Sequence, residues 1–279
     1  MGASTRTWHA AVTPERALRR YRRSQRVVEY HHPFIEGGGT RACARGRVCK
    51  SFRGVPWNEW IRTVEIEPSL YAANFARLGE QIDVLLRAGA RVFHFDIGDG
   101  HFVPPITIGP IVLQSISPQI HALEGVIDVH LMTATPEKHF AAIAEAGGDS
   151  VTVHLEACPD PAAAAQAARE QELQVGLAFK PETSPEQAAA AADGFDAVLC
   201  MSIEPGYSGQ EFMSDALDRI RKLRALLPEE MPIQVDGGID LENIRNVHEA
   251  GATLFVAGTS IFAREDLSRA YRRLVQALA

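Results

Sequence analysis

One repeated pattern constrains the fold of this chain more than any other feature of its sequence. From residue 63 to residue 279, short apolar segments alternate with stretches of helical periodicity, in units of about 25 residues. Eight apolar segments are expected to form strands: Val64–Pro68, Arg91–Ile97, Val126–Met132, Ser150–His154, Leu173–Phe179, Ala197–Ile203, Pro232–Asp236 and Thr253–Ala257. Helices are expected at Phe75–Ala88, Ile111–Ile116, Glu137–Ala146, Pro161–Gln171, Pro185–Ala192, Asp215–Leu227, Leu241–Ala250 and Arg264–Leu278. Eight alternations of this kind predict an α/β fold, the closed (β/α)8 TIM barrel.

An open doubly wound sheet is the alternative architecture. It usually has fewer strands, and a Gly-rich turn follows its first strand. Here Val64–Pro68 runs into Ser69, Leu70 and Tyr71, with no G-x-G-x-x-G pattern. The closed barrel is therefore favoured, with residues 63–279 as its domain.

Residues 1–62 form a basic segment ahead of this domain. They hold 13 Lys and Arg against 4 Asp and Glu, whereas residues 63–279 hold 15 against 31. Six arginines fall between Arg16 and Arg26, and three consecutive glycines follow at 37–39. We expect a disordered N-terminal extension. Two alternatives are a translation start placed too far upstream and a functional tail, such as a transit peptide or an arm for an anionic partner.

Composition excludes several classes of protein. With 46% hydrophobic and 23% charged residues, the chain has the balance of a globular protein rather than a disordered one. No apolar run approaches the ~20 residues of a membrane span, and residues 1–30 contain no run typical of a secretory signal. The acidic domain argues against binding to nucleic acid. These features predict a cytoplasmic protein that acts without a membrane or a nucleic-acid partner.

Polar side chains stand at the carboxyl ends of three expected strands, which is where barrels of this class carry their chemistry. His94 and Asp96 alternate with Phe93 and Phe95, so they share the opposite face of their strand. His130 lies near the end of the next strand, and Asp236 ends the seventh. Two imidazoles and two carboxylates from three strand tips suit one divalent metal ion, for which Zn²⁺, Fe²⁺, Mn²⁺ and Co²⁺ are candidates.

Glycine-rich segments follow the sixth, seventh and eighth strands. Gly237-Gly238 and Gly258-Thr259 lie where barrels of this type bind a phosphate through backbone N–H groups. The segment Gly206-Tyr207-Ser208-Gly209 suits a loop that closes over a ligand. A phosphorylated small molecule is therefore the expected partner of the site.

Residues 64–279 resemble the ribulose-phosphate 3-epimerase family over nearly the whole family domain. The matching stretches are Pro68-Ser69-Leu70, His94-Phe95-Asp96, Asp99-Gly100-His101-Phe102-Val103-Pro104, Ile106-Thr107-Ile108-Gly109, Asp128-Val129-His130-Leu131-Met132, Glu204-Pro205-Gly206, Val235-Asp236-Gly237-Gly238 and Val256-Ala257-Gly258. The resemblance implies a barrel of the ribulose-phosphate-binding type and a metal held by His94, Asp96, His130 and Asp236. It also implies a homo-oligomer, and a substrate bound by Ser69, His130, Met132, Gly206, Tyr207, Ser208, Gly209, Gly237, Gly238, Gly258 and Thr259.

The implied reaction inverts C3 of a ketose phosphate, D-ribulose 5-phosphate to D-xylulose 5-phosphate, through an enediolate. Asp96 and Asp236 are expected to act as the acid–base pair. Two departures from the family pattern bear on the substrate: Gly98 stands where methionine is common, which we expect to widen the pocket, and Pro105 stands where asparagine is common. The alternatives are therefore 3-epimerisation of another ketose phosphate, such as a ketohexose 6-phosphate, and a catalytically silent sugar-phosphate-binding barrel. His154, two residues before Glu156, is expected to be a hydrogen-bonded structural residue of the barrel.

Overall fold

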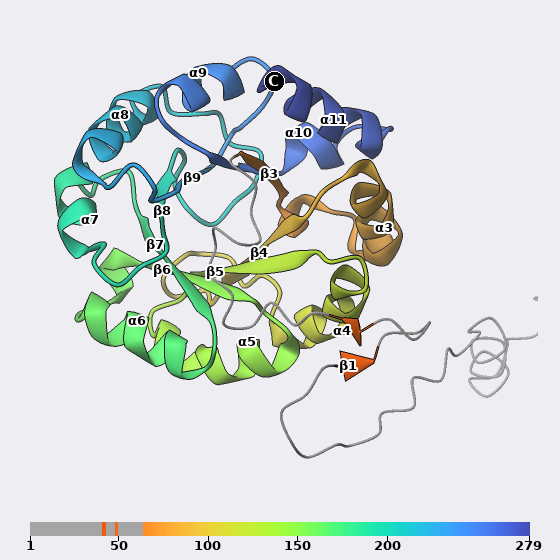
Figure 1. The fold of residues 1–279 in the computed structure, drawn as a ribbon, viewed down its shortest axis with the longest axis horizontal. Coiled ribbons are helices and arrows are strands. Elements are labelled where there is room, and N and C mark those ends of the chain that lie inside the picture. Colours follow the sequence, from red (N-terminus) through yellow and green to blue (C-terminus); the bar gives the residue numbers. More distant parts are fainter. Residues whose placement is uncertain (1–40, 43–47, 50–63) are drawn as a thin grey trace, which may run out of the picture. The chain divides into compact units, whose positions relative to one another are not determined.

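The computed structural model describes residues 41–42, 48–49 and 64–279. Eight parallel strands form one sheet in the order β3-β10-β9-β8-β7-β6-β5-β4. A parallel bridge between Ser69 and His94 joins the first strand to the last, so the sheet curls into a barrel (Figure 1). The strands are β3 Glu65–Pro68, β4 Val92–Gly98, β5 Val126–Met132, β6 Ser150–His154, β7 Gln174–Phe179, β8 Ala197–Met201, β9 Ile233–Asp236 and β10 Leu254–Ala257. The predicted TIM barrel is confirmed.

Helices surround the strands in a ring (Figure 1). The α-helices are α3 Leu78–Ala88, α4 Pro110–His121, α5 Phe140–Ala146, α6 Pro161–Glu170, α7 Pro185–Ala191, α8 Ala216–Leu226, α9 Ile244–Glu249, α10 Thr259–Phe262 and α11 Leu267–Ala277. Short 3-10 helices are η1 Leu70–Ala72, η2 Phe75–Arg77, η3 Pro136–His139 and η4 Leu155–Ala157. None of the helices in the described part of the chain is long and apolar enough to span a membrane.

The alternation of side chains along each strand divides the interior into two parts. Outward-facing residues such as Phe93, Phe95 and Val129 are fully buried in the core between the sheet and the helices. A separate small cluster inside the barrel consists of Ala178, Leu199, Met201 and Ile203, from β7, β8 and the turn after β8. The barrel interior is therefore apolar beside β7 and β8, which leaves polar groups to the other strands.

Local sequence signals explain several helix boundaries. The Ser184 hydroxyl accepts a hydrogen bond from the backbone N–H of Gln187, and Oε1 of Gln187 accepts one from the backbone N–H of Ser184. Pro185 is the first residue of α7. This capping box satisfies N–H groups that the first helical turn leaves unpaired. Asp160 and Asp266 cap α6 and α11 in the same sense. Ser184 and Asp160 lie where the segments that leave the carboxyl ends of β7 and β6 enter a helix. These two caps therefore fix the far ends of those segments.

Some elements differ from the sequence prediction. Helix α4 continues past Ile116 to His121 although Pro118 lies inside it, and α9 is shorter at both ends than expected. The short helix α10 directly follows Gly258 and comes before the expected last helix. Two short strands, β1 Arg41–Ala42 and β2 Val48–Cys49, pair in antiparallel fashion. The expectation of disorder for residues 1–62 otherwise lies outside the described residues.

Candidate active site

The four side chains expected to hold a metal meet at one point of the barrel mouth. His94 and Asp96 come from β4, His130 from the neighbouring β5, and Asp236 from the tip of β9. One ligand atom from each lies within 4.8 Å of those of the others. Nδ1 of His130 is 3.2 Å from Oδ1 of Asp96 and 3.6 Å from Oδ2 of Asp236. Nε2 of His94 is 3.4 Å from Oδ1 of Asp96 and 4.0 Å from Oδ2 of Asp236.

These separations fit a single divalent ion. Two ligand atoms about 2.1 Å from a tetrahedral ion lie about 3.4 Å apart. Among the described residues, neither ring nitrogen of the fully buried His94 has a hydrogen-bond partner of acceptable geometry. Buried polar atoms without partners are rare in proteins, and a cation between the rings and the carboxylates would satisfy Nε2.

The environment of the cluster lowers the pKa of one aspartate and raises that of the other. Burial alone would raise the pKa of Asp96, but the adjacent His94 and His130 rings hold it well below its usual value. Burial, reinforced by the charge of Asp96, raises the pKa of Asp236 to about 6. Burial opposes a charge on His94, yet the carboxylates around it raise its pKa well above the usual value. Because a cation favours ionised carboxylates, its binding would bring both aspartates to the charged form.

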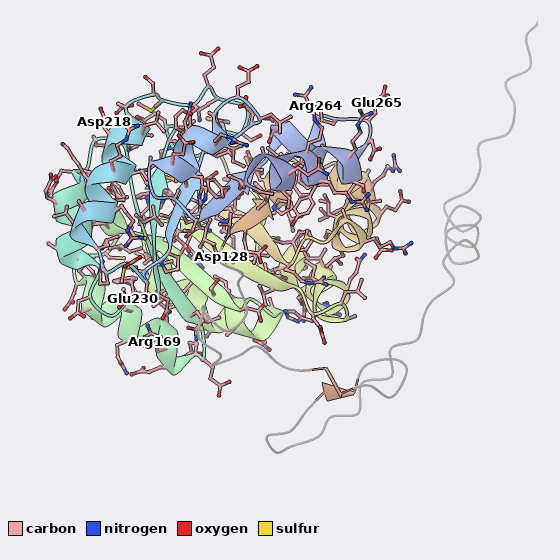
Figure 2. The ribbon with its side chains drawn as sticks, turned by 45° about the horizontal axis from the view of Figure 1, so that its top comes forward. Asp128, Arg169, Asp218, Glu230, Arg264 and Glu265 are labelled. Carbon is pink, nitrogen blue, oxygen red and sulfur yellow. The ribbon has the colours of Figure 1, made fainter. Side chains whose placement is uncertain are left out.

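A second polar layer lies beneath the cluster. Asp128, on β5, accepts hydrogen bonds from Ser150, Thr152 and Gln234, and its Oδ2 is 3.2 Å from Nδ1 of His94. Gln234 also donates to Glu67, whose pKa is raised to about 7 by burial. Figure 2 places Asp128 among the central strands, whereas the other labelled charged residues lie at the periphery. Asp128 thus faces Nδ1 of His94, while Nε2 of His94 faces Asp96 and Asp236.

His130 is held by a different pair of residues. Its Nε2 is 2.9 Å from Nε2 of His154, and the two rings stack with centroids 5.0 Å apart. Nδ1 of His154 is 3.4 Å from Oε2 of Glu156. Burial lowers the pKa of His154 to about 4, so the ring is neutral. Burial would raise the pKa of Glu156, but hydrogen bonds from His154 and from the Lys180–Thr183 segment hold it at about 2.

The expected substrate residues gather around the same mouth. Ser69 donates a hydrogen bond of 2.7 Å to Oδ2 of Asp96. A Cβ built on Gly258 would lie 3.9 Å from Cβ of Ser69, and one on Gly209 would lie 3.6 Å from Cγ2 of Thr259. Met132 ends β5 and is buried, in register with Gly98. Ser69 thus lies between Asp96 and Gly258, and Gly209 lies beside Thr259 at the start of α10.

The loop expected to act as a lid is held by a residue that the sequence did not single out. Nε2 of Gln210 donates to the carbonyl oxygens of Glu204 and Tyr207. Gly206 and Gly209 both have positive φ, at 122° and 85°, and Tyr207 is 55% exposed. Ser208, between them, is exposed as well. The positive φ angles of Gly206 and Gly209 therefore allow the loop to turn, and the Gln210 side chain joins two of its backbone carbonyls by hydrogen bonds.

The expectation that Gly98 widens the pocket is wrong. A Cβ built on Gly98 would lie 2.9 Å from the carbonyl oxygen of Pro105, 2.9 Å from Cγ2 of Val103 and 3.2 Å from Cγ2 of Thr107. The backbone N–H of Gly98 also donates to the Thr107 hydroxyl. The loop after β4 therefore fills the space that a side chain at Gly98 would take.

Replacement of Gly98 by alanine is expected to destabilise the protein by about 1–3 kcal/mol, because the new methyl group would press on a backbone carbonyl. Chemical denaturation of the full chain measures this change. Gly109→Ala is the control, since a Cβ at Gly109 meets nothing within 4 Å. A G98A protein as stable as wild type would show that the loop after β4 yields freely.

Two polar groups beneath the site escaped the sequence prediction although a simple rule points to them. Glu67 lies two residues before Ser69, and Gln234 two residues before Asp236. Because side chains alternate along a strand, Glu67 and Gln234 share the inward face of Ser69 and Asp236, which the sequence had identified. The same alternation places His154 inside the barrel, where it is hydrogen-bonded as expected, and in contact with His130.

The barrel and the polar cluster at the carboxyl ends of its strands define an enzyme of the (β/α)8 class. The model of the ribulose-phosphate 3-epimerase family matches residues 65–262, and the chain belongs to this family, a family of carbohydrate epimerases. Ribulose-phosphate 3-epimerase of Escherichia coli (strain K12) is 38% identical over 217 residues, which are 77% of this chain and 96% of the relative. The enzyme of the same name from Bacillus subtilis (strain 168) is 36% identical over 211 residues, 74% of this chain and 96% of the relative.

Solved structures at lower identity share the fold. A 3-hexulose-6-phosphate synthase superposes with a TM-score of 0.61 at 21% identity, covering 77% of this chain and all of the other. An orotidine 5'-phosphate decarboxylase from Pyrococcus horikoshii gives a TM-score of 0.57 at 15% identity, covering 76% of this chain and 98% of the other. At these identities the likeness concerns the barrel alone.

Proposed function

We propose that this chain catalyses the metal-dependent inversion of C3 of D-ribulose 5-phosphate to D-xylulose 5-phosphate. The observation that carries the proposal is the meeting of His94, Asp96, His130 and Asp236 within 4.8 Å at the barrel mouth. The names and coverage of the relatives support the substrate. His94, Asp96, His130 and Asp236 would hold one divalent ion.

Lewis-acid stabilisation of the charge that develops on the C2 and C3 oxygens is the chemistry that a divalent ion supplies at such a site. The carboxyl groups of Asp96 and Asp236 do the proton work. One removes the C3 proton, which is acidic because it lies next to the C2 carbonyl, and the resulting enediolate is planar at C3. The other delivers a proton to the opposite face, and the two exchange roles in the reverse direction.

The surrounding residues position these groups. The Ser69 hydroxyl holds Oδ2 of Asp96, which fixes the direction of the second oxygen toward the two imidazole rings. Met132 and Met201 are buried at the ends of β5 and β8 and supply apolar surface beside the reacting carbon. Such a wall excludes water, and it strengthens the electrostatic interactions of the intermediate.

The phosphate would lie at the glycine tips. Gly237 and Gly238 adopt positive φ, at 123° and 64°, and Gly258 with Thr259 opens α10. Backbone N–H groups in such turns bind anions, and a barrel of this type places them after its seventh and eighth strands. The loop from Gly206 to Gly209 would close over the substrate.

A methyl group at Gly238 is expected to raise the KM for D-ribulose 5-phosphate at least about 10-fold, because a close backbone fit is lost. A Cβ at Gly238 would lie 2.6 Å from the backbone N of Phe212. Steady-state kinetics of G238A against G194A test this expectation. Gly194 also has positive φ, at 82°, but its Cβ would meet only Ala165 at 3.9 Å. Equal KM values for the two variants would remove Gly238 from the phosphate site.

The substrate is tested by assaying the full chain, loaded with zinc, on D-ribulose 5-phosphate and on a ketohexose 6-phosphate. Product from D-ribulose 5-phosphate is identified by a coupled enzyme that accepts D-xylulose 5-phosphate only, and product from the hexulose phosphate is followed by NMR. We expect the pentulose phosphate to have the higher kcat/KM. A preference for the hexulose phosphate would identify another 3-epimerase, and binding without turnover of either would identify a silent sugar-phosphate-binding barrel.

The expected partner is therefore a small sugar phosphate. Self-association and a cytoplasmic location stay predictions. The absence of nucleic-acid binding, inferred from the acidic charge of residues 63–279, stays a prediction as well.

A further inference from the structure

His130 has two ring nitrogens with different neighbours. Nδ1 faces the carboxylates of Asp96 and Asp236, at 3.2 Å and 3.6 Å, and Nε2 faces His154 at 2.9 Å. A neutral imidazole carries one proton, and only the nitrogen without it can bind a metal. For Nδ1 to be a ligand, the His130 proton must therefore lie on Nε2.

This requirement determines the proton position on His154. Two ring nitrogens 2.9 Å apart share one proton, so Nε2 of His154 must accept the proton that Nε2 of His130 donates. The His154 proton then lies on Nδ1, 3.4 Å from Oε2 of Glu156. A carboxylate only accepts hydrogen bonds, so Glu156 permits this tautomer and opposes the other.

Glu156 is itself held in orientation. The backbone N–H of Lys180 donates to its Oε1 at 2.9 Å, and the hydroxyl of Thr183 donates to the same oxygen. Oε2 is thereby left for His154. Phe102 covers the His154 ring, with centroids 4.8 Å apart, and the ammonium of Lys180 lies 4.3 Å from the Phe102 centroid. The His154 ring is fully buried and cannot exchange its partners for water.

We propose that His154 and Glu156 are positioning residues that fix the tautomer of His130 with Nδ1 free for the metal. The proposal rests on the proposed role of His130 as a ligand. It assigns a purpose to a carboxylate that touches no ligand candidate: Glu156 acts through two imidazole rings. Groups that orient a metal-binding histidine through its second nitrogen commonly contribute to metal affinity.

The isosteric variant Glu156→Gln gives a sharp test. The N–H of Lys180 can only donate, so the amide oxygen of glutamine is expected to take the place of Oε1. Its NH₂ group would then face Nδ1 of His154 and donate to it. The His154 proton would move to Nε2, and the His130 proton to Nδ1, where it competes with the metal. Glutamine has nearly the same shape as glutamate, but both His154 and His130 would carry their ring proton on the other nitrogen.

Zinc affinity of the full-length protein, measured by competition with a chromophoric chelator, is the readout. We expect the Kd of Glu156→Gln for zinc to rise about 10–100-fold over wild type. Glu182→Gln, which removes one negative charge from an exposed residue between Lys180 and Thr183, is the matched control and should leave the Kd unchanged. Equal Kd values for wild type and Glu156→Gln overturn the inference alone. A wild-type chain that does not bind zinc instead overturns the metal site of the proposed function.

Nitrogen-15 NMR of the histidine rings in the zinc-loaded wild-type protein makes the test independent of how the variant folds. We expect the His154 proton on Nδ1 and the His130 proton on Nε2. A His154 proton on Nε2 would overturn the proposal.

Discussion

Replacement of Asp236 by asparagine is expected to lower the rate of epimerisation at least about 1,000-fold. General acid–base catalysis alone contributes about 100- to 10,000-fold, and the amide can neither take nor return the C3 proton. Asp236 is also one of the four groups that meet within 4.8 Å, so its loss weakens the hold on a cation. The coupled assay on D-ribulose 5-phosphate measures the decrease. Asp218→Asn, at a 77% exposed side chain paired with Arg221, controls for the change of charge and should keep wild-type activity.

Proton exchange distinguishes the two-carboxylate mechanism from a general loss of function. In deuterated water, wild type should exchange the C3 hydrogen of both epimers. A D236N protein that still binds zinc retains Asp96, so it should exchange the hydrogen of one epimer only and invert neither. Deuterium incorporation followed by NMR reports this directly. Continued inversion by D236N would exclude Asp236 from the acid–base pair.

The strands and the metal-ligand candidates were predictable because both follow from period-two alternation. His94 and Asp96 stand on the face opposite Phe93 and Phe95, and the structure places the aromatic rings in the core and the polar groups in the barrel. Parallel strands bring their carboxyl ends to one rim, so residues far apart in sequence converge without any further information. The sequence therefore allowed the metal-ligand candidates to be predicted from their positions at the carboxyl ends of the strands.

The hydrogen bonds among the polar side chains beneath the metal-ligand candidates could not be predicted from alternation. Gln234 donates to Glu67, 167 residues away in sequence, and to Asp128, 106 residues away. Which inward polar groups pair depends on barrel closure and on side-chain reach, neither of which alternation specifies. The misreading of Gly98 has a similar origin, because the loop residues Val103 and Pro105 fill the space that the sequence suggested was open.

Polar and apolar side chains occupy different parts of the barrel interior. Ala178, Leu199, Met201 and Ile203 make an apolar interior beside β7 and β8, whereas the titratable groups come from β3 to β6 and β9. Each imidazole of the cluster has a buried polar neighbour at its second nitrogen: Asp128 lies 3.2 Å from Nδ1 of His94, and His154 lies 2.9 Å from Nε2 of His130. The two rings can thus present one nitrogen each to a shared point while their other nitrogens face fixed partners.

Removal of bound metal is expected to abolish epimerisation and to lower the stability of the protein. Without a cation, Asp96 and Asp236 repel each other, and Nε2 of His94 lacks a partner among the described residues. Chelator-treated protein should lose activity to background, and zinc at 100 times its Kd should raise the free energy of unfolding by about 2.7 kcal/mol. The activity assay and thermal unfolding of the same samples check both effects.

The choice of restoring ion follows from the ligand set. Two imidazoles suit Zn²⁺, Fe²⁺, Mn²⁺ or Co²⁺, whereas Mg²⁺ prefers oxygen ligands and retains its water. The first group should restore activity to chelated protein, and Mg²⁺ at the same concentration should not. Chelator neutralised with excess zinc before addition is the control for a direct effect of the chelator. Full activity in metal-free protein would contradict the role of the cluster, because the charge of the enediolate would then be stabilised by side chains alone.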